Sequence, residues 1–227
     1  MYIHSLMYVS DFLRLDSAMA RRTKEEAQVT RSTIMETALG LFCQQGLATT
    51  SLTDIARAAG VTRGAIYWHF KDKEELFFSL WDEMCAPLSH LMLASIDVDE
   101  PDPLGKFQSF LIEVLRTVAA CPAHQQMFRI MFKLLMSDGE LGPIRDMVRQ
   151  EMQEHAQNIR SSLQNAVNRG QLPAALPIER AAVLLHCSMD GLIINWLNHH
   201  ELFDLEREAE PMIKAMFCAM GQGLGAS

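Results

Sequence analysis

The chain has 227 residues, of which 49% are apolar and 21% are charged, which excludes an intrinsically disordered or collagen-like protein. The formal net charge of −8 argues at first against a nucleic-acid partner. The charge is uneven, however: residues 19–75 contain eight basic and seven acidic side chains, whereas residues 76–227 contain eleven basic and nineteen acidic ones. Residues 19–75 are therefore the one segment that is not acidic, and DNA binding is physically reasonable there.

The start of the chain is divided between a predicted extension and a predicted first helix. Residues 1–18 lack the basic region that begins a signal peptide, so we expect an unstructured extension ahead of a natural start at Met19. Thr23 and Glu26 have the spacing of a capping box, which predicts a helix that begins near Thr23. Gly46 follows the apolar residues at helical spacing and predicts the end of that helix.

Capping residues predict three more helices directly afterwards. Ser51 and Asp54 form a second capping box, which begins a helix that Gly60 ends. Thr62 is expected to cap a short third helix, and Asp72 to begin a longer fourth one. These four closely spaced helices predict a compact N-terminal unit.

The remainder of the chain is also predicted to be helical. Apolar residues recur at helical spacing, and no alternating run competes for a strand. The helices expected here are about 107–118, 127–136, 144–166, 177–198 and 205–220. The fold class is therefore all-α.

A helix-turn-helix is predicted between Ser51 and Phe70. Ala56 permits close crossing of two helices, Gly60 permits the turn between them, and Ile66 anchors the second helix on the first. The second helix then exposes arginine and aromatic side chains, and the DNA major groove accommodates such a helix. The alternative is an ordinary helical hairpin whose aromatic residues lie in a core.

The segments Thr23–Ala27 and Thr62–Lys73 resemble the TetR family of bacterial repressors, most closely its AcrR-like branch, which controls multidrug efflux pumps. The likeness of Arg169–Leu172 and Asp190–Ile193 is weaker. The resemblance implies a homodimer that binds a pseudo-palindromic double-stranded DNA operator. It also implies two domains: 19–72 would be the helix-turn-helix domain, and 73–227 would bind a ligand and dimerise.

The resemblance also assigns the DNA contacts. Arg63 and Gly64 would approach the bases, and Ala65 would allow close contact. The remaining expected contacts, mainly to phosphates, are Arg21, Arg22 and Lys24 of a basic arm, Thr50, Thr62, Tyr67, Trp68, His69 and Lys73.

The larger domain is expected to have a dimer interface and an apolar cavity. The helix 177–198 is apolar on more than one face and is expected to pair with its symmetry mate, together with the last helix. A small hydrophobic or cationic drug-like molecule would occupy the cavity. The expected lining residues are Trp81, Cys85, Phe107, Phe110, Phe128, Phe132, His186, Met189 and Asp190.

Several functional alternatives remain open. No cofactor motif, zinc-ligand spacing, nucleophile elbow or membrane span is found, so we expect a cytoplasmic protein that is not an enzyme. Scattered histidines still permit a metal site in principle. The widely separated cysteines favour free thiols, and Cys85 and Cys121 are the candidates for a thiol-based redox sensor. Regulation of an unrelated metabolic gene, or activation, would use the same DNA-binding unit.

Overall fold

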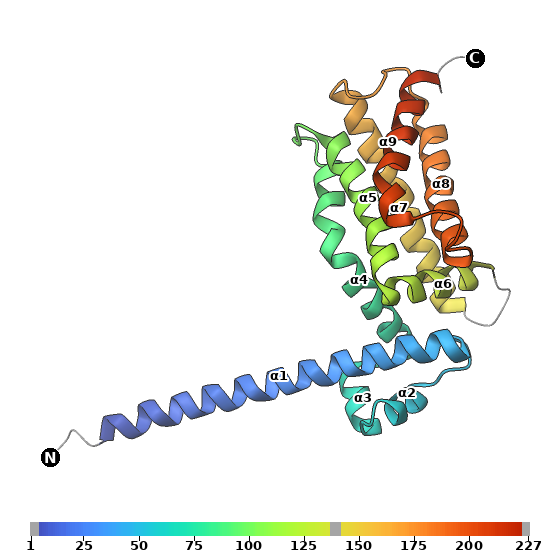
Figure 1. Cartoon of the computed structure of the whole chain (residues 1–227). Coiled ribbons are helices and arrows are strands. Elements are labelled where there is room, and N and C mark those ends of the chain that lie inside the picture. Colours follow the sequence, from blue (N-terminus) through green and yellow to red (C-terminus); the bar gives the residue numbers. More distant parts are fainter. Residues whose placement is uncertain (1–4, 137–141, 224–227) are drawn as a thin grey trace.

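The computed structural model describes the backbone of residues 5–136 and 142–223, and side chains from residue 24 onward within these ranges, except residues 143 and 223. All regular structure in these ranges is helical (Figure 1). The helices are α1 (Ser5–Gln45), α2 (Leu52–Ala58), α3 (Arg63–His69), α4 (Lys73–Ile96), α5 (Pro103–Ala120), α6 (Pro122–Met136), α7 (Gly142–Asn168), α8 (Ile178–Asn198) and α9 (Leu205–Gly223). The all-α prediction is confirmed.

Helix α1 corrects the prediction for the start of the chain. It begins at Ser5 rather than near Thr23, so residues 5–18 are helical and not an unstructured extension. The physical reason is that no glycine or proline occurs between Ser5 and Leu39, so no helix-breaking residue interrupts the backbone at Thr23. The end of α1 was predicted correctly, since Gly46 has a φ of 90°, in the left-handed region.

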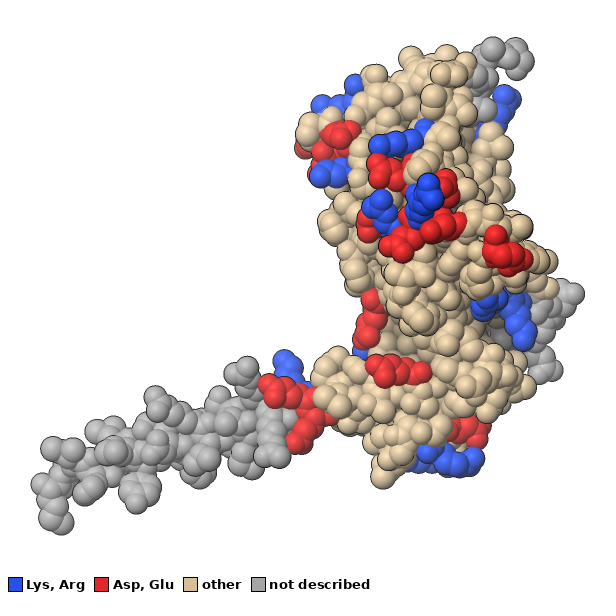
Figure 2. Space-filling model, in the orientation of Figure 1, with Lys and Arg blue, Asp and Glu red and all other residues tan. Residues whose placement is uncertain are grey.

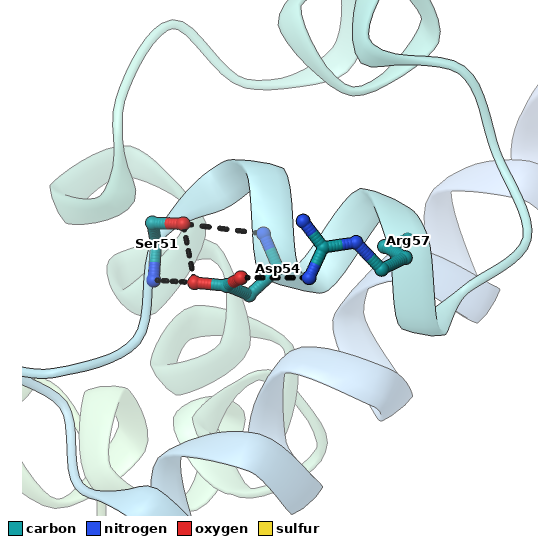
Figure 3. Close-up of polar contacts among 3 residues, drawn as sticks. All are labelled: Ser51, Asp54 and Arg57. Carbon is teal, nitrogen blue, oxygen red and sulfur yellow. Dashed lines mark hydrogen bonds and ion pairs between the residues drawn. The ribbon is translucent and has the colours of Figure 1, made fainter.

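The capping residues of α2 and α3 behave as predicted. The Ser51 hydroxyl accepts a hydrogen bond from the Asp54 N–H, and the Asp54 carboxylate accepts one from the Ser51 N–H (Figure 3). Gly60 then takes a φ of 68°, which ends α2 in a turn that a larger residue would resist. The Thr62 hydroxyl accepts a hydrogen bond from the Ala65 N–H at 3.1 Å and begins α3.

Six helices, α4 to α9, form the larger part of the molecule, while α1 lies across one end with α2 and α3 on its far side (Figure 1). Helix α5 lies beside α4, α7 and α9, and its buried Phe107 and Leu115 contribute to the core of this bundle. Helix α4 begins next to α2 and α3 and continues into the bundle, so one helix connects both parts of the structure.

A second hydrophobic core joins α1, α2, α3 and α4 to helices α6 and α7. Phe42 of α1 and Phe77 of α4 pack edge to face with ring centroids 6.4 Å apart. Met127, Ile130 and Ile144 from the bundle belong to the same buried cluster. The helix-turn-helix unit is therefore packed directly against the base of the bundle.

Candidate nucleic-acid interface and ligand cavity

The helix-turn-helix presents one face of α3 to solvent. Ile55 and Ala56 of α2 and Ile66 of α3 are buried against one another, which fixes the crossing of the two helices. On the opposite face of α3, Tyr67 is 45% exposed and Trp68 is 73% exposed. Two large aromatic side chains on a short exposed helix are unusual for a surface without a partner, and they favour the recognition-helix interpretation over the ordinary hairpin.

Arg63 and His69, at the two ends of α3, each contact one of its exposed aromatic rings. The Arg63 guanidinium lies 5.7 Å from the centre of the Tyr67 ring, close enough for a cation–π contact. Trp68 packs edge to face with His69, with ring centroids 4.5 Å apart. Burial, followed by the charge of Arg31, lowers the pKa of His69, which favours its neutral ring. The expected base and phosphate contacts of these residues remain predictions.

Four other expected contacts are Gly64, Lys24, Arg21 and Arg22. A Cβ atom on Gly64 would meet only the Thr62 hydroxyl at 3.8 Å, so nothing in the described chain requires a glycine there. Lys24 is exposed on α1 and is free to approach DNA. The side chains of Arg21 and Arg22 lie outside the described residues.

Two of the expected phosphate contacts need correction. Thr50 is 1% exposed, and its hydroxyl donates to the Gly46 carbonyl at 2.8 Å, so it stabilises the α1–α2 connection. The ammonium of Lys73 lies 2.7 Å from the Leu47 carbonyl, 3.3 Å from that of Ala48 and 3.1 Å from that of Thr50. An ammonium has three hydrogens, and these three carbonyls can accept all of them. Lys73 therefore holds this connection in place instead of pointing outward to a phosphate.

The larger domain carries charges of both signs on its surface. In Figure 2 they gather over α5 and α9, where Arg116 pairs with Glu113 at 3.1 Å and with Glu210 at 3.3 Å. These pairs are partly exposed and contribute little stability individually. Their balance leaves no strongly basic surface there that would compete with α3 for DNA.

The bundle contains two adjoining cavities with volumes of about 300 Å³ and about 110 Å³. They share a wall that includes Trp81, Phe110, Phe128 and His155. The larger cavity also contacts Cys85 and lies against α4, whereas the smaller one extends to Phe132, His186, Met189 and Asp190. Eight of the nine side chains predicted to line a cavity are therefore brought together.

Phe107 is the exception. It is fully buried and packs edge to face on Phe217, with ring centroids 5.9 Å apart, in the core between α5 and α9. Phe107 and Phe110 are three residues apart and so share a side of α5, but Phe110 lines both cavities whereas Phe107, one turn earlier, packs on α9. An apolar residue on an amphipathic helix does not by itself reveal which neighbour it contacts.

The cavities contain polar residues that the sequence analysis did not assign to them. Glu151 and His155, from α7, line both cavities, and Asp82 and Glu154 line the larger one. Burial, followed by the charges of Glu154 and Asp82, raises the pKa of Glu151. His155 lies at helical spacing with the apolar residues Met152 and Ile159, which is consistent with its inward position, but no local signal distinguishes Glu151 from an exposed glutamate.

A histidine–carboxylate pair lies in the smaller cavity. His186 Nε2 is 3.4 Å from the Asp190 carboxylate, one helical turn away on α8. Burial raises the pKa of Asp190, while the neighbouring His186 opposes that shift. Burial, followed by the charge of His186, lowers the pKa of His155 across the cavity. This cavity is therefore mostly apolar, with a few polar groups that could orient a ligand.

The described residues offer no support for a metal site or a membrane segment. No group of three His, Cys, Asp or Glu side chains within the described ranges is arranged to hold a metal ion. None of the helices from α1 to α9, as far as they are described, is both long and apolar enough to cross a bilayer.

Comparisons with known proteins agree with this geometry. Residues 34–80 match the family model of bacterial regulatory proteins of the tetR family, and residues 102–221 match that of the MAATS-type transcriptional repressor C-terminal region. The transcriptional regulator AcrR of Shigella flexneri is 39% identical over 86% of this chain and 91% of its own length.

Two solved structures are similar as well. NalD, the secondary repressor of the MexAB-OprM multidrug efflux pump in Pseudomonas aeruginosa, has a TM-score of 0.68 and 28% identity, over 86% of this chain and 98% of NalD. The complex of SmeT, from Stenotrophomonas maltophilia, with triclosan has a TM-score of 0.71 and 26% identity, over 82% of this chain and 90% of SmeT. The recognition-helix geometry, both family matches and these relatives lead to one conclusion: the chain belongs to the TetR family of transcriptional regulators.

Proposed function

We propose that this protein is a homodimeric repressor of a multidrug efflux pump operon, and that a lipophilic cation binds in its cavities and releases it from the operator. NalD and SmeT, which are similar in structure, are both repressors of multidrug efflux pumps, and SmeT is known in complex with triclosan. This role requires no catalysis, and it is exercised in the cytoplasm, where the operator is.

The proposed ligand class rests on the charges of the residues that line the cavities. Aromatic walls lie beside the carboxylates of Asp82, Glu151 and Glu154, and no lysine or arginine is among the described residues that line either cavity. A lipophilic cation gains both apolar burial and electrostatic attraction there. An anion of the same shape would instead be repelled by carboxylates in a partly desolvated site, where charge repulsion is stronger than in water.

The DNA part of the proposal rests on α3. In a symmetric dimer, the two recognition helices would enter successive major grooves about 34–36 Å apart, or a multiple of that spacing. Arg63 would pair with a guanine, and Trp68 would contact the DNA beside it. Replacing Arg63 with Ala should relax base preference and weaken operator binding by about 1–3 kcal/mol.

Helix α8 supplies the expected dimer surface. Val183 and Leu184 are exposed apolar residues on it, with Cys187 beside them. A Cβ atom on Gly191 would meet nothing within 4 Å inside the subunit, which leaves room for close approach by a partner helix. An exposed apolar helix face of this kind is best covered by its symmetry mate.

Helix α4 connects the ligand to the DNA. Its residues Trp81 and Cys85 line the larger cavity, while Lys73 at its start holds the α1–α2 connection. A ligand that displaces α4 would change the spacing of the two recognition helices. A coupling of about 1–3 kcal/mol would weaken operator binding roughly 5- to 150-fold.

An isosteric ion pair provides the test. Tetraphenylphosphonium and tetraphenylborate have nearly the same shape and opposite charge. We expect the cation to bind by calorimetry and to release a labelled operator duplex, and the anion to do neither. The Glu151→Gln variant should bind the cation more weakly, whereas Glu113→Gln, which removes a surface carboxylate on α5, should not. Equal binding of both ions would refute the proposed ligand class.

A thiol-based sensor that uses Cys85 is less consistent with the geometry. Burial, followed by the charges of Asp82 and Glu151, raises the pKa of the Cys85 thiol to about 12. Oxidation proceeds through the thiolate, which is scarce at physiological pH when the pKa is that high. Operator release by peroxide that is lost in Cys85→Ser would reverse this preference.

A further inference from the structure

Arg31 of α1 contacts both the recognition helix and α4. Its guanidinium lies 5.2 Å from the centre of the Phe70 ring, the residue that caps the C-terminal end of α3. The same guanidinium forms an ion pair with the Glu83 carboxylate of α4. Arg31 is 27% exposed, so it is partly desolvated and held by both partners. One side chain thus joins α1, the end of α3 and the middle of α4.

Glu83 lies opposite the cavity on the same turn of α4. Its chain neighbours Asp82 and Met84 line the larger cavity, together with Trp81 and Cys85. Successive helical residues are separated by about 100°, so these four surround the inward face and Glu83 points away from it. A displacement of this turn by a ligand on one side must therefore move the partner of Arg31 on the other side.

Pro87 weakens α4 at the same place. A proline within a helix has no N–H to donate to the carbonyl four residues earlier, and its ring crowds that carbonyl. For Pro87, which lies inside α4, this carbonyl belongs to Glu83. The helical hydrogen bond to the Glu83 carbonyl is therefore missing, and this turn of α4 is less rigid. The position of the turn then depends more strongly on the ion pair between Glu83 and Arg31.

Two other contacts of α4 with the DNA-binding unit lie nearer the start of the helix and do not reach the turn that lines the cavity. Lys73 binds the α1–α2 connection, and Phe77 packs on Phe42, but both precede the cavity-lining turn. Glu83 is ten residues after Lys73, which corresponds to roughly 15 Å along a helix. Among the described residues, the Arg31–Glu83 pair thus reaches from the DNA-binding unit to the level of the cavity.

We propose that Arg31 and Glu83 are positioning residues, and that their ion pair holds the recognition helix in its operator-binding arrangement until a ligand displaces α4. This inference rests on the proposed function. By itself, however, it also predicts that the pair contributes to operator affinity when no ligand is present. The two statements can be tested separately.

The experiment compares the full-length protein with two variants. Glu83→Gln removes the charge that Arg31 binds, and Glu113→Gln is the matched control. Glu113 of α5 pairs with Arg116 at 3.1 Å, so the control also breaks a partly exposed ion pair, away from Arg31 and from the expected dimer surface of α8. Operator affinity is measured by fluorescence anisotropy with and without tetraphenylphosphonium, and thermal melting establishes that each variant is folded.

We expect Glu83→Gln to weaken ligand-free operator binding. A partly exposed ion pair affects the equilibrium by about two- to fivefold. Two independent copies in a dimer then give roughly 4- to 25-fold. Tetraphenylphosphonium should weaken operator binding further in Glu83→Gln, but by a smaller factor than in the wild type, the difference being again roughly 4- to 25-fold. The affinity of the DNA-free variant for the cation should stay within about threefold of the wild-type value. Glu113→Gln should match the wild type in every measurement.

The outcomes separate the two proposals. If Glu83→Gln binds the ligand-free operator within twofold of the wild type, or more tightly, the positioning role is wrong. If the wild type does not respond to tetraphenylphosphonium while Glu83→Gln still weakens operator binding, the ligand class is wrong and the positioning role stands.

Discussion

Replacing Lys73 with Ala should destabilise the protein without removing a phosphate contact. The variant loses an ammonium that donates to the carbonyls of Leu47, Ala48 and Thr50. Burial lowers the pKa of Lys73, which indicates that its charge is partly desolvated and depends on these partners. A hydrogen bond to a charged group contributes about 1.5–3 kcal/mol. Here three carbonyls share one ammonium and water can reach the site, so the three contributions do not add in full.

We therefore expect the free energy of unfolding to fall by about 2–3 kcal/mol, more than for one weak bond but less than for three full ones. For a chain of this size, that loss corresponds to roughly 4–12 °C in melting temperature. Urea denaturation gives the free energy. Lys71→Ala is the control, because the Lys71 side chain is 78% exposed and lies 3.9 Å from Asp72, so its stability should change by less than about 0.5 kcal/mol.

The salt dependence of operator binding distinguishes the two roles of Lys73. A lysine on a phosphate contributes about 0.9 to the slope of log affinity against log salt concentration, or nearly 2 for a symmetric dimer. If Lys73 only holds the connection before α2, Lys73→Ala weakens operator binding but leaves this slope unchanged. A slope smaller by about 2, with unchanged stability, would refute the assignment and restore the phosphate contact.

Three further predictions follow from burial and charge. Trp68→Ala should change stability by less than about 0.5 kcal/mol, yet weaken operator binding roughly 30-fold in anisotropy titrations, because its side chain is exposed and available to DNA. Phe107→Ala should lower the free energy of unfolding by about 3–5 kcal/mol but leave tetraphenylphosphonium affinity intact, because Phe107 packs on Phe217 in the core. Phe128→Ala should weaken that affinity in calorimetry, because Phe128 lines the cavity. The pKa of Glu151 is raised, so its carboxylate is protonated at a higher pH than that of an ordinary glutamate. The affinity for tetraphenylphosphonium should therefore fall on acidification, beginning above the pH range in which an ordinary glutamate is protonated, and fall less in Glu151→Gln; parallel profiles would contradict this.

Features that depend on neighbouring residues could be predicted from the sequence. The capping box of Ser51 and Asp54 and the Thr62 cap each use a side chain and a backbone N–H three residues apart. The turn at Gly60 depends on the φ of one residue. These interactions need no knowledge of the tertiary structure, so the positions of α2 and α3, and hence the exposed face of α3, followed from the order of residues.

Features that depend on distant residues could not be predicted in this way. The Lys73 ammonium binds carbonyls more than twenty positions earlier, and nothing near Lys73 in the sequence distinguishes that role from a phosphate contact. Glu151 resembles the exposed glutamates of α7 until α4 is packed against it. The one error in the cavity list, Phe107, has the same cause, because helical periodicity gives the buried face but not its neighbour.

The second hydrophobic core gives the ligand a further connection to the DNA-binding unit. Met131 of α6 lines the smaller cavity and also belongs to the buried cluster that contains Phe42 of α1 and Ile66 of α3. Close-packed side chains cannot shift without displacing their neighbours, so a ligand that moves Met131 acts on the packing beneath α3. In the proposed mechanism, helix α4 would transmit a displacement along its axis, whereas α6 would transmit one through the core. Both lead to the orientation of α3, because the helix-turn-helix unit shares its core with the bundle instead of being joined to it by a flexible linker.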